Sequence, residues 1–348
     1  MLSLAAGVWA DRASPKKIIR VGEMVRTLGL ASLAFMTASG MLTLPLLVVC
    51  CFLFTIGAVT NAVAVPSLIF VVLAKDSFAA SNGRVELVRS LAYVGGPALT
   101  GALLGGAEPW SAFLVAAIFS AIALGFMFHL QQPATTVKIE RHIFRDAYDG
   151  AIFCFKHASL RSILSVSIIF NIAFFTLQAA YVPYAMKSLK FSPEMISLTV
   201  VAYGIGMVIG AAMAVKISAL FSSKNVFLIG PLSGLLAAVM LLSTLWFPSF
   251  YSALLCFMLF GFGPIIWTVS TTTFRQHVTP PDLIARVSAI NTMAAYGSRP
   301  IGAAIGGVTG SCFGVQFCLW LAVAVFALQL GLTLKSPLTA PTQVHGKA

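Results

Sequence analysis

Long apolar stretches alternate with short polar connections along the whole chain. A helix that crosses a bilayer needs about 20 mostly apolar residues. Ten stretches reach that length, at residues 18–40, 46–70, 85–106, 110–130, 162–186, 196–221, 226–247, 250–274, 287–311 and 313–334. Residues 1–10 are apolar for only half that length and run directly into Asp11 and Arg12, which is not typical of a cleavable signal peptide. The pattern predicts an all-α polytopic membrane protein with ten full spans and a half span.

The composition excludes a soluble protein. Of the 348 residues, 59% are hydrophobic and 9% are charged, whereas a soluble domain carries about 25% charged residues. The six cysteines include no C-x-x-C pair, so they indicate neither a disulfide framework nor a metal site. We expect the lipid bilayer to surround most of the chain.

The charges are distributed unevenly between alternate connections. The chain has a net charge of +12, and 17 of its 22 basic residues lie in or beside one set of connections, whereas the opposite set holds only Lys187 and Lys190. Basic loops face the cytoplasm in membrane proteins. The pattern predicts a multi-pass protein of a bacterial plasma (inner) membrane with a cytoplasmic C-terminus. Since topology explains the net charge, no nucleic-acid partner is needed to account for it.

The longest connection, residues 131–161, has its own pattern. Its apolar residues recur every four positions, at Ile139, Ile143, Ala147, Ala151 and Phe155. This spacing predicts a helix lying in the cytoplasmic membrane interface, which we interpret as a linker. We therefore expect four parts: a first half at 1–130, the linker at 131–161, a six-helix second half at 162–335 and a cytoplasmic tail at 336–348.

The two halves contain similar stretches. Residues 84–97 and 286–300 both open with Arg-Val, carry a Gly before a Pro, and are followed by Gly-Gly. Such a repeat is typical of a transporter built from two duplicated halves. Because the first half has only four full spans and a half span, we expect its first helix and part of its second to be missing. Gly-x-x-x-Gly spacings at 101–105, 206–210 and 302–310 predict closely packed helices.

Residues 7–19 read GVWADRASPKKII. This stretch resembles the signature loop of the major facilitator superfamily, and the matching positions are Gly7, Asp11, Arg12, Lys16 and Lys17. It departs from the signature at position 9, where Leu is usual, and at positions 14–15, where Gly and Arg are usual. The resemblance implies a fold of two six-helix halves, with this loop joining helices two and three. It also implies a secondary transporter without catalytic residues, metal or cofactor.

Within that superfamily, one branch resembles this chain more specifically. The stretches 66–69, 82–92, 147–157 and 286–302 are similar to the bacterial enterobactin-exporter and macrolide-efflux branch. The resemblance implies export of a siderophore-like or drug-like molecule.

Asp11 is a single acid in a basic connection. A carboxylate there is able to meet the positive N-terminus of a neighbouring helix, or an arginine, and hold a cytoplasmic gate shut. The resemblance points to the start of the 287–311 stretch as that neighbour. Lys16 and Lys17 are expected to anchor the chain at the anionic leaflet, with a purely topological role as the alternative.

Three arginines fall inside predicted spans. Arg26 and Arg89 each follow a glutamate by three residues, a spacing that predicts a local ion pair on one helix. Arg299 lies thirteen residues beyond Arg286, which places it about 20 Å deep along a helix. No acid of the chain is expected at that depth, so its counter-ion is on the missing helices, is a distant Glu108, or is an anionic substrate. Structural pairing and substrate binding both stay open.

Further polar residues lie at the centres of predicted spans. The resemblance places them on helices that line the substrate cavity, whereas hydrogen bonding between helices is the alternative. With Arg299, these cavity candidates are Asn61, Asn171, Gln178, Trp267 and Thr271. The 27 phenylalanines and the few charges within spans favour a bulky, largely apolar cargo.

Taken together, the patterns predict a secondary active transporter that exports an amphiphilic small molecule by alternating access. The chain has no phosphate-binding Gly-x-x-x-x-Gly-Lys-Ser/Thr motif, so an ion gradient is the expected energy source, with protons as the coupling ion. The carboxylate that binds the proton is Asp11 or Glu23, or lies on the missing helix. Two alternatives remain, a membrane-embedded enzyme acting on lipid and a non-transporting truncated remnant.

Overall fold

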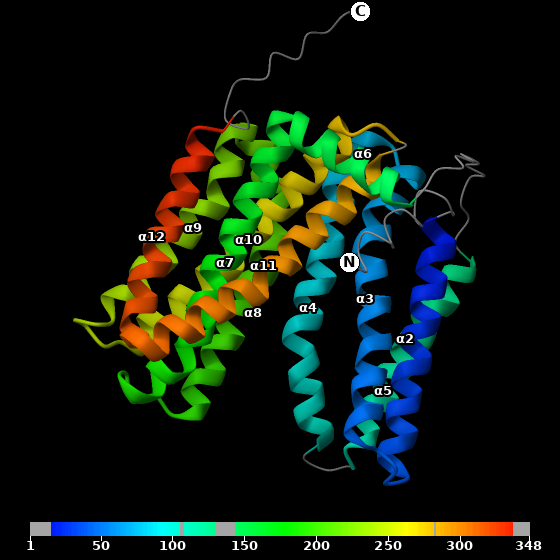
Figure 1. Cartoon of the computed structure of the whole chain (residues 1–348), viewed down its shortest axis with the longest axis horizontal. Coiled ribbons are helices and arrows are strands. Elements are labelled where there is room, and N and C mark those ends of the chain that lie inside the picture. The colour runs from blue at the N-terminus through cyan, green and yellow to red at the C-terminus, as the bar shows by residue number, and fades with distance from the viewer. Residues whose placement is uncertain (1–14, 105–107, 130–142, 282, 337–348) are drawn as a thin grey trace, which may run out of the picture. The chain divides into compact units, whose positions relative to one another are not determined.

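A computed structural model describes residues 15–104, 108–129, 143–281 and 283–336 of the chain. Eleven α-helices and one short 3-10 helix make up most of this described part (Figure 1). They are α2 (Pro15–Ala38), α3 (Leu44–Val72), η1 (Lys75–Ser77), α4 (Phe78–Leu104), α5 (Trp110–His129), α6 (Ile143–Lys156), α7 (Ala158–Lys187), α8 (Pro193–Leu220), α9 (Ser223–Ser243), α10 (Phe250–Val278), α11 (Ile284–Phe313) and α12 (Val315–Leu334). The all-helical prediction is confirmed. Each predicted span falls on one helix, and the linker helix falls at α6; the half span at 1–10 lies outside the described residues.

Seven helices of the described part are long and apolar enough to cross a membrane: α3, α5, α7, α8, α9, α10 and α12. The three other long helices, α2, α4 and α11, contain more polar residues. For example, α2 contains Glu23 and Arg26, and α4 contains Glu86 and Arg89. The count of ten full spans and a half span therefore stays a prediction.

The helices form two compact units by their contacts. Unit 1 comprises Met1–Phe78, Gly95–Phe153 and Gln276–Met293. Within it, α2 lies alongside α3 and α5 (Figure 1). The first turn of α11 also belongs to this unit, because Ala285 packs with Ile18, Ile19 and Ala64 in one buried cluster.

Unit 2 comprises Ala79–Val94, Cys154–Arg275 and Ala294–Ala348. Within it, α12 lies alongside α7 and α9 (Figure 1). Its core is rich in aromatic rings, and the ring of Phe260 lies 5.3 Å from that of Phe174 and 5.5 Å from that of Phe326. Close packing of such side chains holds helices together in lipid, where the hydrophobic effect gives no net drive.

The Gly-x-x-x-Gly predictions are confirmed at two places in unit 2. A methyl group on Gly206 would collide with the carbonyl oxygen of Met258 on α10. On α11, a methyl group on Gly302 or Gly306 would lie 2.5 Å from the carbonyl oxygens of Ile172 and Thr176 on α7. The backbones of these helix pairs are in contact because glycine leaves room for them. The spacing at 101–105 falls partly outside the described residues.

The unit boundaries cut four helices, α4 after Phe78 and Val94, α6 after Phe153, α10 after Arg275 and α11 after Met293. Each unit therefore includes a helical segment from the other half of the sequence. In unit 1, the Gln276 side chain donates a hydrogen bond from Nε2 to the carbonyl oxygen of Pro66, 3.0 Å away. The domain boundaries expected from the sequence remain predictions.

Candidate functional site

The described residues place two clusters of polar side chains within the helices, one in each unit. The first, which we call the Glu23 cluster, consists of Glu23, Arg26, Thr27, Asn61 and Ser120. The second, the Arg299 cluster, consists of Arg299, Asn171, Tyr296 and Phe175. Both include residues that the sequence pattern singled out.

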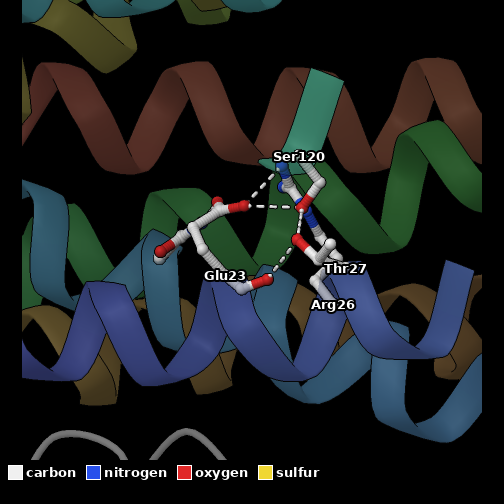
Figure 2. Close-up of polar contacts among 5 residues, drawn as sticks. Glu23, Arg26, Thr27 and Ser120 are labelled. Atoms are coloured by element: carbon white, nitrogen blue, oxygen red, sulfur yellow. Dashed lines mark hydrogen bonds and ion pairs between the residues drawn. The ribbon is translucent and has the colours of Figure 1, made fainter. Parts of the chain in front are cut away.

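Glu23 lies on α2 in unit 1, and only 4% of it is exposed. Its carboxylate pairs with Arg26 one turn later, with 2.8 Å between Oε2 and Nη2. This is the local ion pair that the spacing of the two residues predicts. Figure 2 shows the side chains of Arg26 and Ser120 directed toward the carboxylate.

Two other helices complete this cluster. Ser120 on α5 donates from Oγ to Oε2 of Glu23 at 2.9 Å and accepts from Nε of Arg26 at 3.2 Å. Asn61 on α3 donates from Nδ2 to the other carboxylate oxygen. The Thr27 hydroxyl lies 2.8 Å from both the backbone oxygen of Glu23 and Oγ of Ser120 (Figure 2). Three helices therefore share one buried carboxylate, an arrangement that holds α2, α3 and α5 together.

Asn61, one of the cavity candidates, lies against Glu23, and its place at a substrate cavity stays a prediction. Its Oδ1 is buried and has no hydrogen-bond partner among the described residues. The observed contact is the helix-to-helix hydrogen bond that was the alternative reading of this amide. An unpaired buried oxygen costs about 1–3 kcal/mol, so this side of Asn61 is the weak point of the cluster.

Arg299 lies in the middle of α11, in unit 2, and is partly exposed. It donates a hydrogen bond from Nε to Oδ1 of Asn171 on α7, 3.1 Å away. Its guanidinium carbon lies 4.3 Å from the ring centre of Tyr296 and 5.3 Å from that of Phe175. A guanidinium held against aromatic rings is attracted by their electron-rich faces, an interaction of about 0.5–2 kcal/mol.

The electrostatic environment of Arg299 differs from that of the other span arginines. No acidic side chain of the described residues forms an ion pair with it. The ionisable groups that act on it are the tyrosines Tyr296, Tyr203 and Tyr93 and a second cation, Arg89. Arg89 itself pairs with Glu86 at 2.6 Å. Among the described residues, Arg299 is therefore a cation compensated only by an amide oxygen and aromatic rings.

The three remaining cavity candidates stay apart from these clusters. Gln178 is exposed on α7 and makes no side-chain hydrogen bond within the described part of the chain. The hydroxyl of Thr271 donates to the backbone oxygen of Trp267 at 2.8 Å. The indole Nε1 of Trp267 is buried and has no partner among the residues described. Their role in a cavity stays a prediction.

The predicted gate motif is described only in part. Gly7, Asp11 and Arg12 lie outside the described residues. Lys16 and Lys17 lie in the first turn of α2, where Nζ of Lys16 is 3.5 Å from the carbonyl oxygen of Phe128 at the end of α5. This places the two lysines at one end of unit 1, and their role as anchors or topology signals stays open.

Some residues of both clusters were not selected from the sequence. Ser120 is a lone hydroxyl in an apolar stretch, and nothing in the sequence shows that α5 packs against α2. Phe175 is one of 27 phenylalanines, and its role depends on which helix faces α11. Tyr296 had a readable signal, since it precedes Arg299 by three residues and so shares its helix face.

Comparisons with known proteins agree with the helical architecture. A family model described as "Transmembrane secretion effector" matches residues 1–345. The structure is similar to that of the human organic anion transporter MFSD10 (TETRAN), with a TM-score of 0.80 and 16% sequence identity over 95% of this chain and 80% of that one.

Two bacterial structures are also similar. A bacterial homologue of the iron transporter ferroportin, in its outward-facing state, has a TM-score of 0.75 and 15% identity over 96% of this chain and 86% of its own. The E. coli fucose:proton symporter FucP has a TM-score of 0.70 and 14% identity, over 96% of this chain and 87% of its own. These likenesses concern the fold. No sequence among the curated proteins matches the chain.

Proposed function

The chain belongs to the transmembrane secretion effector family of major facilitator transporters, and we propose that it exports an amphiphilic small molecule by alternating access. The cargo is siderophore-like or drug-like, and the membrane is the bacterial inner membrane, with the C-terminus in the cytoplasm. This proposal joins the family membership to the resemblance of the sequence to the enterobactin-exporter and macrolide-efflux branch.

The observation that carries the proposal is the position of Arg299. A charged side chain at the centre of a bilayer costs about 2.5–3.5 kcal/mol by insertion scales, so such residues face a water-filled path, a counter-ion or a ligand. Arg299 lies in the middle of α11, is partly exposed and has no ion-pair partner among the described residues. This supports a polar passage along α11, which a transporter needs and a purely structural helix bundle does not.

The proposed coupling ion is the proton, as in the fucose:proton symporter that shares the fold. Both oxygens of Glu23 accept hydrogen bonds, and its carboxylate pairs with Arg26, where α2, α3 and α5 meet. We therefore assign a structural role to Glu23 and propose Asp11 as the carboxylate that binds the proton.

We also propose that Asp11 closes a cytoplasmic gate with the first turn of α11. Ile18 and Ile19, a few residues beyond Asp11, pack with Ala285 of that turn in unit 1. A helix N-terminus carries a partial positive charge that attracts a carboxylate within about one turn. Arg12, Lys16 and Lys17 then flank the gate on the basic cytoplasmic side.

The proposal is tested in an efflux-deficient bacterial strain grown with a siderophore or a macrolide. Cells that make the chain are expected to accumulate less of the compound than cells with an empty vector. Equal accumulation of every compound in both strains would contradict export by this chain. Reduced accumulation only with a version extended upstream would favour the non-transporting alternative. No observation favours the enzyme alternative.

A further inference from the structure

We infer that Arg299 anchors a planar anionic group of the transported molecule, with a carboxylate as the simplest example. The anion binds at the two terminal nitrogens of the guanidinium, beside Tyr296 and Phe175. This inference rests on the proposed transport function and adds the charge class of the cargo to it.

The guanidinium of Arg299 has five N–H donors. Arg299 uses Nε–H for Asn171, and its Nη1 and Nη2 have no acceptor among the described residues. The four remaining donors form a planar fork whose geometry matches the two oxygens of a carboxylate. A partly buried fork without an acceptor is costly, and an anionic ligand removes this cost.

The guanidinium of Arg299 is held in place by its neighbours. Asn171, which accepts from Nε, is itself fixed by a hydrogen bond from its Nδ2 to the carbonyl oxygen of Ser167, at 2.9 Å. The rings of Tyr296 and Phe175 contact the guanidinium, with distances of 4.3 and 5.3 Å to its carbon. A preorganised fork loses little side-chain entropy when a ligand binds. The same two rings offer an apolar surface to the rest of an amphiphilic molecule.

The other two span arginines, Arg26 and Arg89, differ from Arg299 in their partners. Arg26 and Arg89 each pair with a glutamate three residues earlier, at 2.8 and 2.6 Å. The neighbours of Arg299 on its helix face include no acid: the positions three and four residues away hold Ala295, Tyr296, Gly302 and Ala303. Arg89, the second cation that acts on Arg299, is itself neutralised by its pair with Glu86. Arg26 and Arg89 thus each have a carboxylate partner, whereas the described residues supply none to Arg299.

The test is a binding measurement on the purified full chain in detergent, by isothermal titration calorimetry. The probes are benzoate, 2-naphthoate and 4-phenylbenzoate, each paired with its neutral primary amide. At least one acid is expected to bind about 10- to 100-fold more tightly than its amide, the factor for a pair of charge-assisted hydrogen bonds. In Arg299→Gln the preference for the acid is expected to disappear, and in Arg299→Lys, which keeps the charge without the fork, only part of it is expected to remain.

Arg89→Gln is the matched control, since it removes a nearby positive charge without touching the aromatic contacts. It is expected to retain most of the acid preference. Equal binding of acid and amide by the unaltered chain, including no binding of either, would overturn the inference, as would an acid preference that survives Arg299→Gln. Each variant must first show an unfolding temperature close to that of the unaltered chain, and Arg299→Lys serves where Arg299→Gln does not.

The binding test and the efflux test have independent outcomes, so each one checks a different proposal. Export of a macrolide without any acid preference leaves the proposed function intact and removes the anion site. An Arg299-dependent acid preference without efflux of any compound keeps the site and contradicts transport by this chain.

Discussion

The Glu23 cluster and the Arg299 cluster surround a charged side chain in different ways. Each places a charged side chain among apolar helices. Around Glu23, three helices contribute an arginine, a serine and an asparagine, so the charge is matched within unit 1. Around Arg299 the described residues contribute one amide oxygen and two rings. The difference lies in how many hydrogen-bonding groups of each charge the described residues match, and the proposed anion site is at the charge with unmatched donors.

The strongest way to break this comparison is Glu23→Gln. It leaves Arg26 without a counter-ion in unit 1, and breaking a buried pair typically costs about 3–5 kcal/mol. We expect a large fall in the thermal unfolding temperature of the detergent-solubilised chain. Glu86→Gln is the comparison variant: Glu86 is also buried, but the side chain of its partner Arg89 is 54% exposed, against 26% for Arg26, so we expect a smaller loss. Equal losses in the two variants would mean that Glu23 does not hold α2, α3 and α5 together.

Gly302→Leu is expected to disturb the Arg299 cluster without replacing any of its residues. A leucine there collides with the carbonyl oxygen of Ile172 and forces α11 away from α7. Overpacking of this kind typically costs about 1–3 kcal/mol, and Asn171 and Arg299 lose their alignment. Thermal unfolding and the acid preference in calorimetry should both decline. Gly331→Leu is the control, since a methyl group at Gly331 meets nothing within 4 Å.

Ser120→Ala separates the hydrogen bonds of the Glu23 cluster from its ion pair. It removes one donor to Oε2 of Glu23 and one acceptor for Nε of Arg26, which we expect to cost about 1–2 kcal/mol. Ser197→Ala, which removes an exposed hydroxyl bonded only to Pro193 of its own helix, should change the unfolding temperature little. An effect of Ser120→Ala no larger than that of Ser197→Ala would show that the ion pair alone stabilises the cluster.

Arg299→Gln is expected to change stability least. It loses one hydrogen bond to Asn171 and two ring contacts, and it also removes an unpaired charge, so the net change is about 1 kcal/mol or less. The measurement is again the unfolding temperature. A loss as large as that of Glu23→Gln would place Arg299 among the structural charges and contradict the comparison.

Helices and local pairs of this molecule were predictable from the sequence because they depend on neighbours along the chain. The apolar stretches located α3 and α12, and the spacing of Glu23 and Arg26 predicted their ion pair. Gly302 and Gly306 were recognisable as contact positions because small residues repeat on one helix face.

Contacts between distant helices were not predictable in the same way. The hydrogen bond from Asn61 to Glu23 forms because α3 packs against α2, and no sequence pattern shows that packing. Ser120 gave no signal, since a serine in an apolar helix usually bonds to its own backbone. The pairing of Asn171 with Arg299 required knowing that α7 and α11 are neighbours, which only the folded chain reveals.

The glycine contacts between α7 and α11 fix the position of Arg299 relative to Asn171. Gly302 meets Ile172 and Gly306 meets Thr176, one turn further along both helices, so the two helices run in the same direction in a single alignment. A slip by one turn would move Arg299 about 5.4 Å along α7 and out of reach of Asn171. Because this alignment depends on main-chain atoms, the side chains of the cluster are free to vary. If the proposed anion site binds the cargo, exchanging Asn171, Tyr296 or Arg299 changes the cargo while the helices keep their places.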